Sequence, residues 1–367
     1  MSFWLARKPS GQQSDHIQRF DPRFWTVNFP RPMMASVVTT AADALRVECS
    51  FHHEGELAGL IWESEDTLDH PLLAYETRAD YAHCVLRFRW RSGGVLALDV
   101  PHGPTLTIEG RDAEGRKRAW YVRLWNYASG SPTDAQIELR FSELESGFSL
   151  PGEAIHPHDI ERMFISLAPQ GYVEGSEAVL PTRVDGWAEM SAIGCEGAGA
   201  MLAIGDVLIP AHGEQIATAY DDSFNQTPAR LLRSAEGLGY RGRIVHYVGM
   251  SHYFRLEPLG GGHYVSLAGG VLNEPCAAWH RSFAEQAKIR DFDVIWSLSY
   301  ELFDAHCWND WKQRAHDGSP ALTGWEPPST LLSPAHEGAM SYLRQGANAF
   351  VAIAQAAGLS VLFQIGE

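Results

Sequence analysis

The sequence is poor in cysteine and in positive charge, and each shortage excludes a class of protein. Its five cysteines are odd in number, widely spaced and without a Cys-x-x-Cys pair. Zinc ribbons and disulfide frameworks need paired cysteines, so we expect buried, reduced thiols instead. Basic residues number 29 against 45 acidic ones, which leaves a net charge of −16. Because nucleic acids and anionic lipids attract basic patches, the sequence predicts no nucleic-acid partner and no membrane partner.

Long apolar runs and cofactor motifs are missing as well. No stretch is apolar for long enough to span a bilayer, and residues 1–8 lack the apolar core of a signal peptide. We therefore expect the chain to be made and folded in a cytoplasm. The sequence has no phosphate-binding glycine loop, no His-Glu-x-x-His and no Gly-x-Ser-x-Gly, and its 16 histidines show no ligand spacing. It therefore predicts no cofactor and no metal site.

Residues 1–35 contain aromatic side chains among prolines, with neither helical nor strand periodicity. Phe20, Trp25 and Phe29 are examples. A disordered tail is normally poorer in aromatic residues. This composition therefore predicts an extended N-terminal arm that packs on a surface.

Residues 36–200 alternate apolar and polar side chains with a period of two. The clearest case is the segment 86–91, where Leu86, Phe88 and Trp90 alternate with three arginines. Such alternation indicates strands with one buried face and one solvated face, as in antiparallel sheets. Turn residues separate these strands at short intervals. We therefore predict an antiparallel β-sandwich or jelly roll over residues 36–200.

Residues 205–367 repeat a different pattern, in which a short apolar run is followed by a turn and a helical stretch. Thr227-Pro228 and Ser333-Pro334 are typical helix starts within this pattern. Strands that alternate with helices make parallel βαβ units, and eight such units close a TIM-type barrel. The four apolar runs predict the first half of a truncated barrel, continuing beyond the chain end; they cover residues 216–220, 244–250, 294–300 and 361–365. The predicted fold class is thus multidomain, with a β-sandwich followed by a β/α barrel.

Carboxylates follow several predicted strands at their carboxyl ends, where barrel enzymes keep their active sites. Asp222, Glu301 and Glu367 hold these positions. Glycoside hydrolysis needs two carboxylates that flank one bond, about 5 Å apart in retaining enzymes. If the protein were an enzyme, these three residues would be its catalytic candidates. We instead interpret them as polar caps of barrel strands, because a barrel fold alone confers no activity.

Three tryptophans are candidates for binding a glycan. Trp308 and Trp311 lie in the unusually long segment 306–330 between the third strand and the third helix, and Trp125 follows a predicted strand of the sandwich. A large aromatic face can cover a ligand ring, but it more often fills a core. The sequence leaves both roles open.

Three segments of the βα part carry a distinctive pattern; they are residues 219–228 (AYDDSFNQTP), 238–242 (LGYRG) and 246–253 (HYVGMSHY). They resemble the barrel domain of non-contractile tail sheath proteins from tailed bacteriophages, and more distantly the barrel domains of gene-transfer-agent tail proteins. The resemblance implies an N-terminal β domain followed by a TIM-type barrel. It implies a structural role in the virion tail, with synthesis in the bacterial host, a homo-oligomeric array and the tail tube protein as partner.

The resemblance carries over no catalytic residue, so no enzyme activity is expected. Two alternatives stay open. The chain could be a glycoside hydrolase that acts on surface polysaccharide, or a carbohydrate-binding tail module without catalysis. In both, the ligand would be a glycan.

Overall fold

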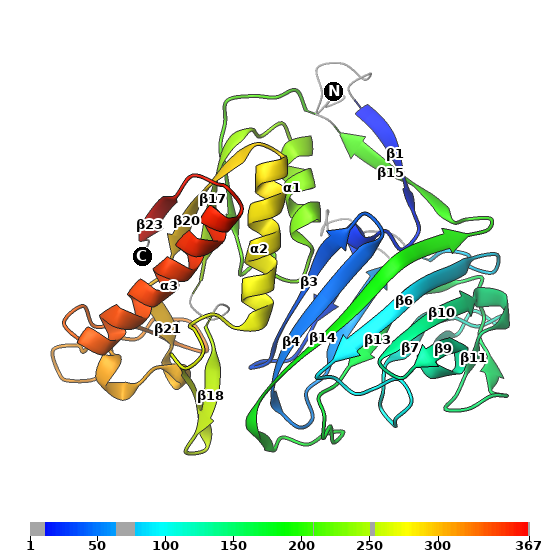
Figure 1. Ribbon diagram of the computed structural model, residues 1–367, viewed down its shortest axis with the longest axis horizontal. Helices are drawn as coiled ribbons and strands as arrows, with labels where there is room; N and C mark the ends of the chain where they lie inside the picture. Colours follow the sequence, from blue (N-terminus) through cyan, green and yellow to red (C-terminus); the bar gives the residue numbers. More distant parts are fainter. Residues whose placement is uncertain (1–11, 64–77, 208, 250–253, 366–367) are drawn as a thin grey trace.

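The computed structural model describes residues 12–63, 78–207, 209–249 and 254–365. This part of the chain is mostly β, with three α-helices. Figure 1 shows two units side by side. Packed antiparallel sheets form the first, on the right of the view, and a small sheet flanked by helices forms the second, on the left.

Within the described residues, the first unit contains two large antiparallel sheets and two small ones. The six-stranded sheet has the order β3 (Met34–Ala41), β4 (Ala44–His53), β14 (Val179–Glu196), β6 (Val85–Gly93), β10 (Asp134–Arg140) and β9 (Ala128–Ser131). The five-stranded sheet has the order β2 (Thr26–Asn28), β5 (Ala58–Glu63), β13 (Ile160–Leu167), β7 (Thr105–Arg111) and β8 (Lys117–Arg123). The two-stranded sheets pair β1 (Gln12–Gln18) with β15 (Met201–Val207), and β11 (Glu145–Ser146) with β12 (Glu153–Ala154). Antiparallel pairing is as predicted, whereas a jelly-roll order of strands stays a prediction.

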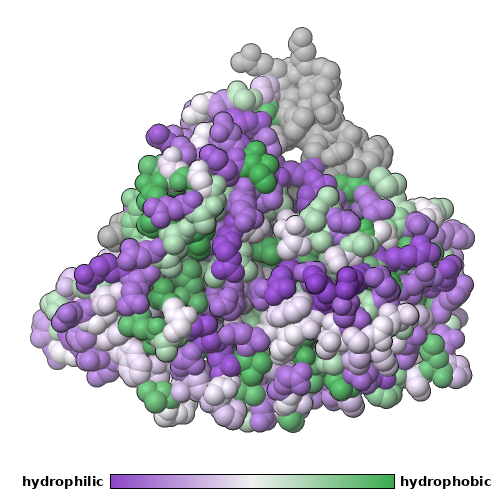
Figure 2. Space-filling model, in the orientation of Figure 1, coloured by the Kyte–Doolittle hydropathy of each residue, from purple (hydrophilic) through white to green (hydrophobic). Residues whose placement is uncertain are grey.

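Strand β6 follows the period of two that its sequence predicts. Leu86, Phe88 and Trp90 are buried, because alternate side chains of a strand point to the same face. The arginines between them face solvent and form cross-strand ion pairs, such as Arg87 with Glu138 of β10 at 2.8 Å. Figure 2 shows a hydrophilic band over this face of the six-stranded sheet.

The core between the two large sheets includes residues from the predicted N-terminal arm. Phe20 and Trp25 are fully buried there, and the indole N–H of Trp25 donates to the carbonyl of Phe20 at 3.1 Å. The ring of Trp25 lies 5.7 Å from that of Trp62 on β5. Strand β2, which follows Trp25 directly, pairs with β5 and so brings the arm into the core. Phe20 and Trp25 of the predicted arm are therefore part of the first unit's interior and do not lie on a surface, while residues 1–11 of the arm lie outside the described residues.

In the part of the chain that the structure describes, the second unit has four parallel strands. Their order is β16 (Ile216–Ala219), β17 (Gly242–Val248), β20 (Phe292–Leu298) and β23 (Leu362–Ile365), and the connecting helices are α1 (Pro228–Gly237), α2 (Glu274–Ile289) and α3 (Glu337–Ala356). The described residues make an open sheet and no closed barrel. Two antiparallel hairpins lie outside this sheet; they pair β18 (Leu256–Leu259) with β19 (Gly262–Val265), and β21 (Glu301–Phe303) with β22 (Ser329–Leu331).

Two helix starts were predicted from a Thr-Pro and a Ser-Pro pair, and the structure confirms one of them. Thr227 caps α1 as predicted, since its side chain accepts from the N–H of Arg230. The predicted start at Ser333-Pro334 is wrong, because α3 begins at Glu337 and is capped by His336. The carbonyl of Ser333 accepts from the N–H of His336 at 3.1 Å, so this segment forms a turn before the helix.

Candidate functional site

The carboxyl ends of the parallel strands pack tightly against one another. At the end of β16, the N–H of Tyr220 donates to the carbonyl of Tyr247 at 2.8 Å and its side chain is fully buried. The carboxylate of Asp221 lies against Gly249, where an added Cβ would come within 1.6 Å of Oδ2. Asp221 and Gly249 therefore fit together only because residue 249 has no side chain.

The candidate carboxylates occupy unlike surroundings. Asp222 is exposed, whereas Glu301 is buried with 7% of its surface exposed. Glu301 begins the hairpin β21–β22, opposite Leu331, and its N–H donates to Ser299 Oγ at 3.2 Å. Glu367 lies outside the described residues. A catalytic pair therefore stays a prediction, and the different exposure of Asp222 and Glu301 offers it no support.

Two of the candidate tryptophans line one cavity of about 320 Å³ beside the hairpin β18–β19. Trp308 stacks on Tyr264 with ring centroids 4.9 Å apart, and its indole N–H donates to the carbonyl of Val265 at 3.0 Å. Trp311, in the 3₁₀ helix η7 (Asn309–Trp311), lines the same cavity. Trp125 does not belong to it, because it packs half-buried against the core of the first unit.

Two buried histidines lie beneath the parallel sheet, and the sequence analysis missed both. His246 on β17 and His280 on α2 have ring centroids 5.4 Å apart within a layer of aromatic side chains. His246 Nδ1 is hydrogen-bonded to Thr218 Oγ1, and His280 Nδ1 to the carbonyl of Cys276, each at 2.8 Å. Burial lowers the pKa of His280 to about 3 and the pKa of His246 well below its ordinary value. Both rings are therefore neutral at ordinary pH. The helical spacing of His280 from Cys276, on the apolar face of α2, is the one signal that predicts its burial.

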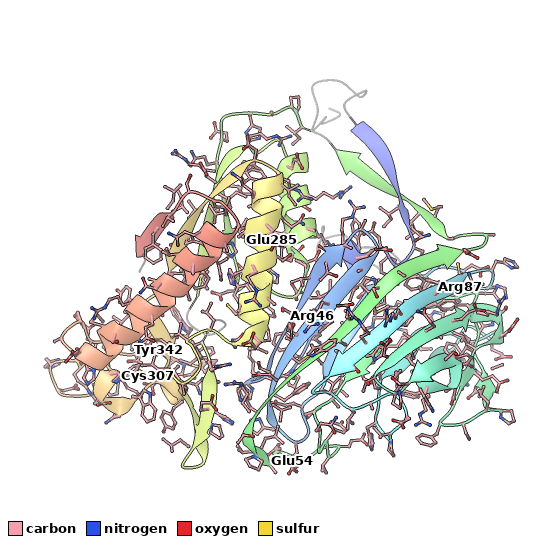
Figure 3. The ribbon with its side chains drawn as sticks, in the orientation of Figure 1. Arg46, Glu54, Arg87, Glu285, Cys307 and Tyr342 are labelled. Carbon is pink, nitrogen blue, oxygen red and sulfur yellow. The ribbon has the colours of Figure 1, made fainter. Side chains whose placement is uncertain are left out.

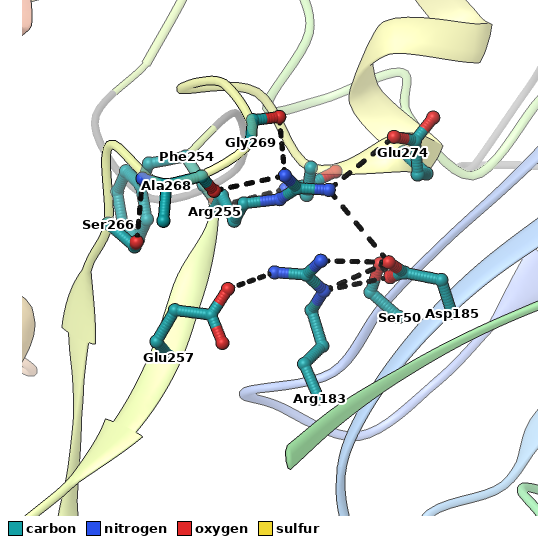
Figure 4. A network of polar contacts seen from close by, with 11 residues as sticks. Ser50, Arg183, Asp185, Phe254, Arg255, Glu257, Ser266, Ala268, Gly269 and Glu274 are labelled. Atoms are coloured by element: carbon teal, nitrogen blue, oxygen red, sulfur yellow. Dashed lines mark hydrogen bonds and ion pairs between the residues drawn. The ribbon is translucent and has the colours of Figure 1, made fainter.

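A polar network connects the two units (Figure 4). Arg183 of β14 bonds to Asp185 on its own strand at 2.9 Å and to Glu257 of β18 at 2.6 Å. Asp185 also accepts from the hydroxyl of Ser50 on β4 at 2.7 Å. Arg255 lies 3.9 Å from Asp185 and 3.6 Å from the carboxylate of Glu274 at the start of α2. Charged groups of both units are thus bonded together at this edge of the contact.

A groove of about 800 Å³ lies between α2 and the strands β3 and β4. Figure 3 labels Glu285 on α2 and Arg46 on β4, which both line it. Arg46 bonds to Glu48 at 2.6 Å and lies over the ring of Trp187 at 4.0 Å. Burial raises the pKa of Glu48, although Arg46 opposes the shift. Both signs of charge therefore line the groove.

Across residues 12–63, 78–207, 209–249 and 254–365, no three His, Cys, Asp or Glu side chains are placed to hold a metal ion. None of the helices described is long and apolar enough to cross a membrane.

By its architecture the chain is a two-unit protein, in which antiparallel sheets precede parallel βαβ units. Residues 17–205 match the family model described as the non-contractile tail sheath N-terminal domain. Residues 210–367 match the model described as the non-contractile tail sheath protein TIM barrel. The chain belongs to the non-contractile tail sheath family, which confirms the resemblance stated from its sequence.

Solved structures with some likeness include carbohydrate-active proteins. A family 30 carbohydrate-binding module of a cellulosomal cellulase from Clostridium thermocellum is 12% identical, with a TM-score of 0.28, over 50% of this chain and 98% of that one. The CBM22-1–GH10 modules of xylanase 10B from the same organism are 9% identical, with a TM-score of 0.32, over 94% of this chain. The match spans 55% of the xylanase chain. Likenesses this weak carry no functional argument.

Proposed function

We propose that this chain is a structural protein of a bacteriophage tail, where copies of it form an array around the tail tube and do not act as an enzyme. One observation carries the proposal: two domain models of a single tail sheath family match consecutive segments, residues 17–205 and 210–367. Location in the virion tail and assembly into a multimeric array follow from this family. The tail tube protein as the contacted partner is our inference.

We propose the same domain limits that the sequence predicts. Residues 1–35 would be the N-terminal arm, residues 36–200 would form the β unit, and residues 205–367 would form the β/α unit. The separate apolar cores of the two units support this division. Its test is limited proteolysis of the purified chain, which should cut first between residues 209 and 215, after β15 and before β16. Cleavage inside either core before this linker would contradict the division.

The tail role is tested on purified virions. Mass spectrometry should find the chain in proportion to the major tube protein, and electron cryomicroscopy should show density of its size repeating along the tail. Tails from phage that lack the gene should have a thinner profile. A single copy per particle, or recovery only from the soluble lysate, would contradict the proposal.

The absence of catalysis is tested with surface polysaccharide of the host. We expect no release of reducing sugar by the purified chain. Release that is lost in Glu301→Gln, but kept in a matched Glu337→Gln variant, would favour the glycoside hydrolase alternative instead.

The carbohydrate-binding alternative has one observation in its favour. Trp308, Trp311 and Tyr264 line a common cavity, and indole rings offer broad faces to ligands. If a glycan binds there, host polysaccharide should change the tryptophan fluorescence of the wild type but not of Trp311→Ala. Trp325→Ala is the matched control, because Trp325 is exposed and does not line this cavity. Equal fluorescence changes in both variants would remove the cavity from consideration.

A further inference from the structure

Four histidines meet where the hairpin β18–β19 touches the first unit. His52 and His53 end β4, His263 lies on β19, and His306 lies in the 3₁₀ helix η6 (Asp304–His306). The ring centroid of His263 is 5.0 Å from that of His52 and 5.0 Å from that of His53. His306 Nδ1 is hydrogen-bonded to the carbonyl of His263 at 2.8 Å. We call these four residues the histidine junction.

Two members of the histidine junction are buried with a ring nitrogen that has no partner. His52 is 3% exposed and His263 is 7% exposed. Among the described residues, nothing hydrogen-bonds to Nδ1 of His52 or to Nε2 of His263. Burying a ring nitrogen without a hydrogen-bond partner raises the free energy of the folded state, and raises it far more when the ring carries a charge.

The arginines that face the histidine junction add to this cost. Arg183 of β14 lies close enough to His52 to repel its charged form, and Arg31 acts in the same way on His306. Arg255 precedes β18 directly, but its guanidinium is bonded to the carbonyl of Gly269. A proton on the junction would therefore meet positive charge from Arg183 and Arg31, which both belong to the first unit.

The nearby carboxylates already have partners. Glu56 is hydrogen-bonded to His53 Nδ1 at 2.8 Å and accepts from the N–H of His52 at 2.6 Å. Glu54 accepts from the hydroxyl of Ser176 at 3.0 Å.

The acidic groups of β14, β18 and η6 are also engaged. Asp185 and Glu257 are both bonded to Arg183. Asp304 of η6 pairs with Lys312 at 2.7 Å. Within the described residues, no carboxylate is bonded to Nδ1 of His52 or to Nε2 of His263.

We propose that the hairpin β18–β19 is a pH-sensitive clasp between the two units, closed while His52 and His263 are neutral and released when they take up protons. The ion pair of Arg183 with Glu257 also holds the hairpin to the first unit, and the two units contact each other away from the hairpin as well. The N–H of Val27 donates to the carbonyl of Asn225 at 2.8 Å, and Thr227 Oγ1 donates to the carbonyl of Arg23 at 2.7 Å. Release is therefore confined to the hairpin, and the units stay joined through α1.

The direction of the pH effect follows from burial. In the closed clasp, burial lowers the pKa of His52 to about 3 and that of His263 to about 4. In the released hairpin both rings reach water, where a histidine has a pKa of about 6.5. The open form therefore binds more protons below about pH 6.5, and each ring increases the open fraction about tenfold per pH unit. Two rings together give about a hundredfold per pH unit, and no change is expected above about pH 7.5.

Hydrogen–deuterium exchange of the full chain between pH 4.5 and 7.5 tests the clasp. After correction for intrinsic exchange rates, protection of residues 254–266 should fall about a hundredfold per pH unit below about pH 6.5. Protection of β6 and β10 should not change in step with it. The double variant His52→Gln/His263→Gln should lose this dependence, and each single variant should keep about a tenfold dependence. His316→Gln is the matched control, because His316 is exposed and should keep the full effect.

Two results would overturn the clasp. One is an unchanged pH dependence of the hairpin in the double variant, and the other is an equal loss of protection over the hairpin and over β6 in the wild type. The second result would indicate global acid unfolding. If the double variant does not fold, the wild-type comparison between these segments decides alone. His280→Gln separates the clasp from the core of the second unit, since it should alter exchange in α2 and leave the hairpin unchanged.

Discussion

Between the two large antiparallel sheets, the core is built from aliphatic and aromatic side chains, whereas the core beneath the parallel sheet also contains His246 and His280. Both histidines are fully buried among aromatic rings. A hydrocarbon core has the same free energy at any pH, but a neutral buried histidine is stable only while it stays unprotonated. The core between the two large sheets should therefore be insensitive to pH, whereas the core beneath the parallel sheet should be pH-dependent. His52 of the first unit lies at the edge of the molecule's first core, in the histidine junction, and adds a separate pH dependence there.

The two units also differ in what covers the faces of their sheets. In the first unit two sheets cover each other, so that tryptophans such as Trp90 and Trp120 are buried from both sides. In the second unit helices cover one face of the parallel sheet, while Val245 and Ile295 of the other face are only half-buried. Four variants test how far the two units differ in what stabilises them.

The largest effect is expected from Trp25→Ala in the first core. Removing a fully buried indole leaves a cavity, and such changes cost about 3–5 kcal/mol of unfolding free energy. Urea denaturation monitored by circular dichroism measures it. Tyr121→Ala, at a residue 59% exposed, should change the free energy by less than about 0.5 kcal/mol. If both variants lose a similar, small amount of unfolding free energy, Trp25 is not part of the core and the N-terminal segment packs as a surface arm.

A smaller effect is expected from Thr227→Val, which alters the contact between the units. The Thr227 hydroxyl caps α1 and donates to the carbonyl of Arg23, and it is fully buried. Losing the cap and leaving that carbonyl without a donor should cost about 2 kcal/mol. Denaturation of this variant is compared with Thr133→Val at an exposed position. If both variants unfold at the same urea concentration, Thr227 does not couple the two units.

The third test uses the pH dependence of the second core. The folded-state pKa of His280 is depressed to about 3 by burial, so its contribution to stability is complete above about pH 6.5 and is lost as the pH falls toward 3. Between about pH 7.5 and 5.5 the loss amounts to about 1.4 kcal/mol for this histidine. The unfolding free energy is measured by denaturation at these two pH values. Its difference between them should be smaller by that amount in His280→Gln than in the wild type. The exposed His316→Gln variant should behave as the wild type, and an unchanged difference in His280→Gln would refute the assignment.

The smallest effect is expected from Arg89→Gln on the outer face of the six-stranded sheet. Arg89 pairs with Asp134 at 2.6 Å, but both side chains are well exposed to water. Exposed ion pairs contribute little, and salt screens them. The denaturation midpoint should not shift measurably at physiological salt. A shift as large as that of Thr227→Val would mean that this charged face stabilises the first unit more than its exposure indicates.

The sequence predicted the local features of both units. Alternation in β6 and the Thr227-Pro228 start of α1 are confirmed, because each depends on residues a few positions apart. Ser333-Pro334 failed as a helix start because a turn uses the same residues, and His336 caps α3 instead. Of the candidate site residues, Trp308 and Trp311 share a cavity, whereas nothing in their spacing indicated that Tyr264 would cover one face of Trp308.

The order of an antiparallel and a parallel part, the family and the strong acidic charge could thus be predicted from the sequence alone. That Phe20 and Trp25 enter a core, and that His52 lies beside His263, is known from the tertiary structure. The physical reason is that periodicity reports which face of an element is apolar, while burial of a particular side chain depends on which distant element covers that face. The local sequence pattern of a histidine or of an N-terminal segment is the same whether water or another strand lies next to it.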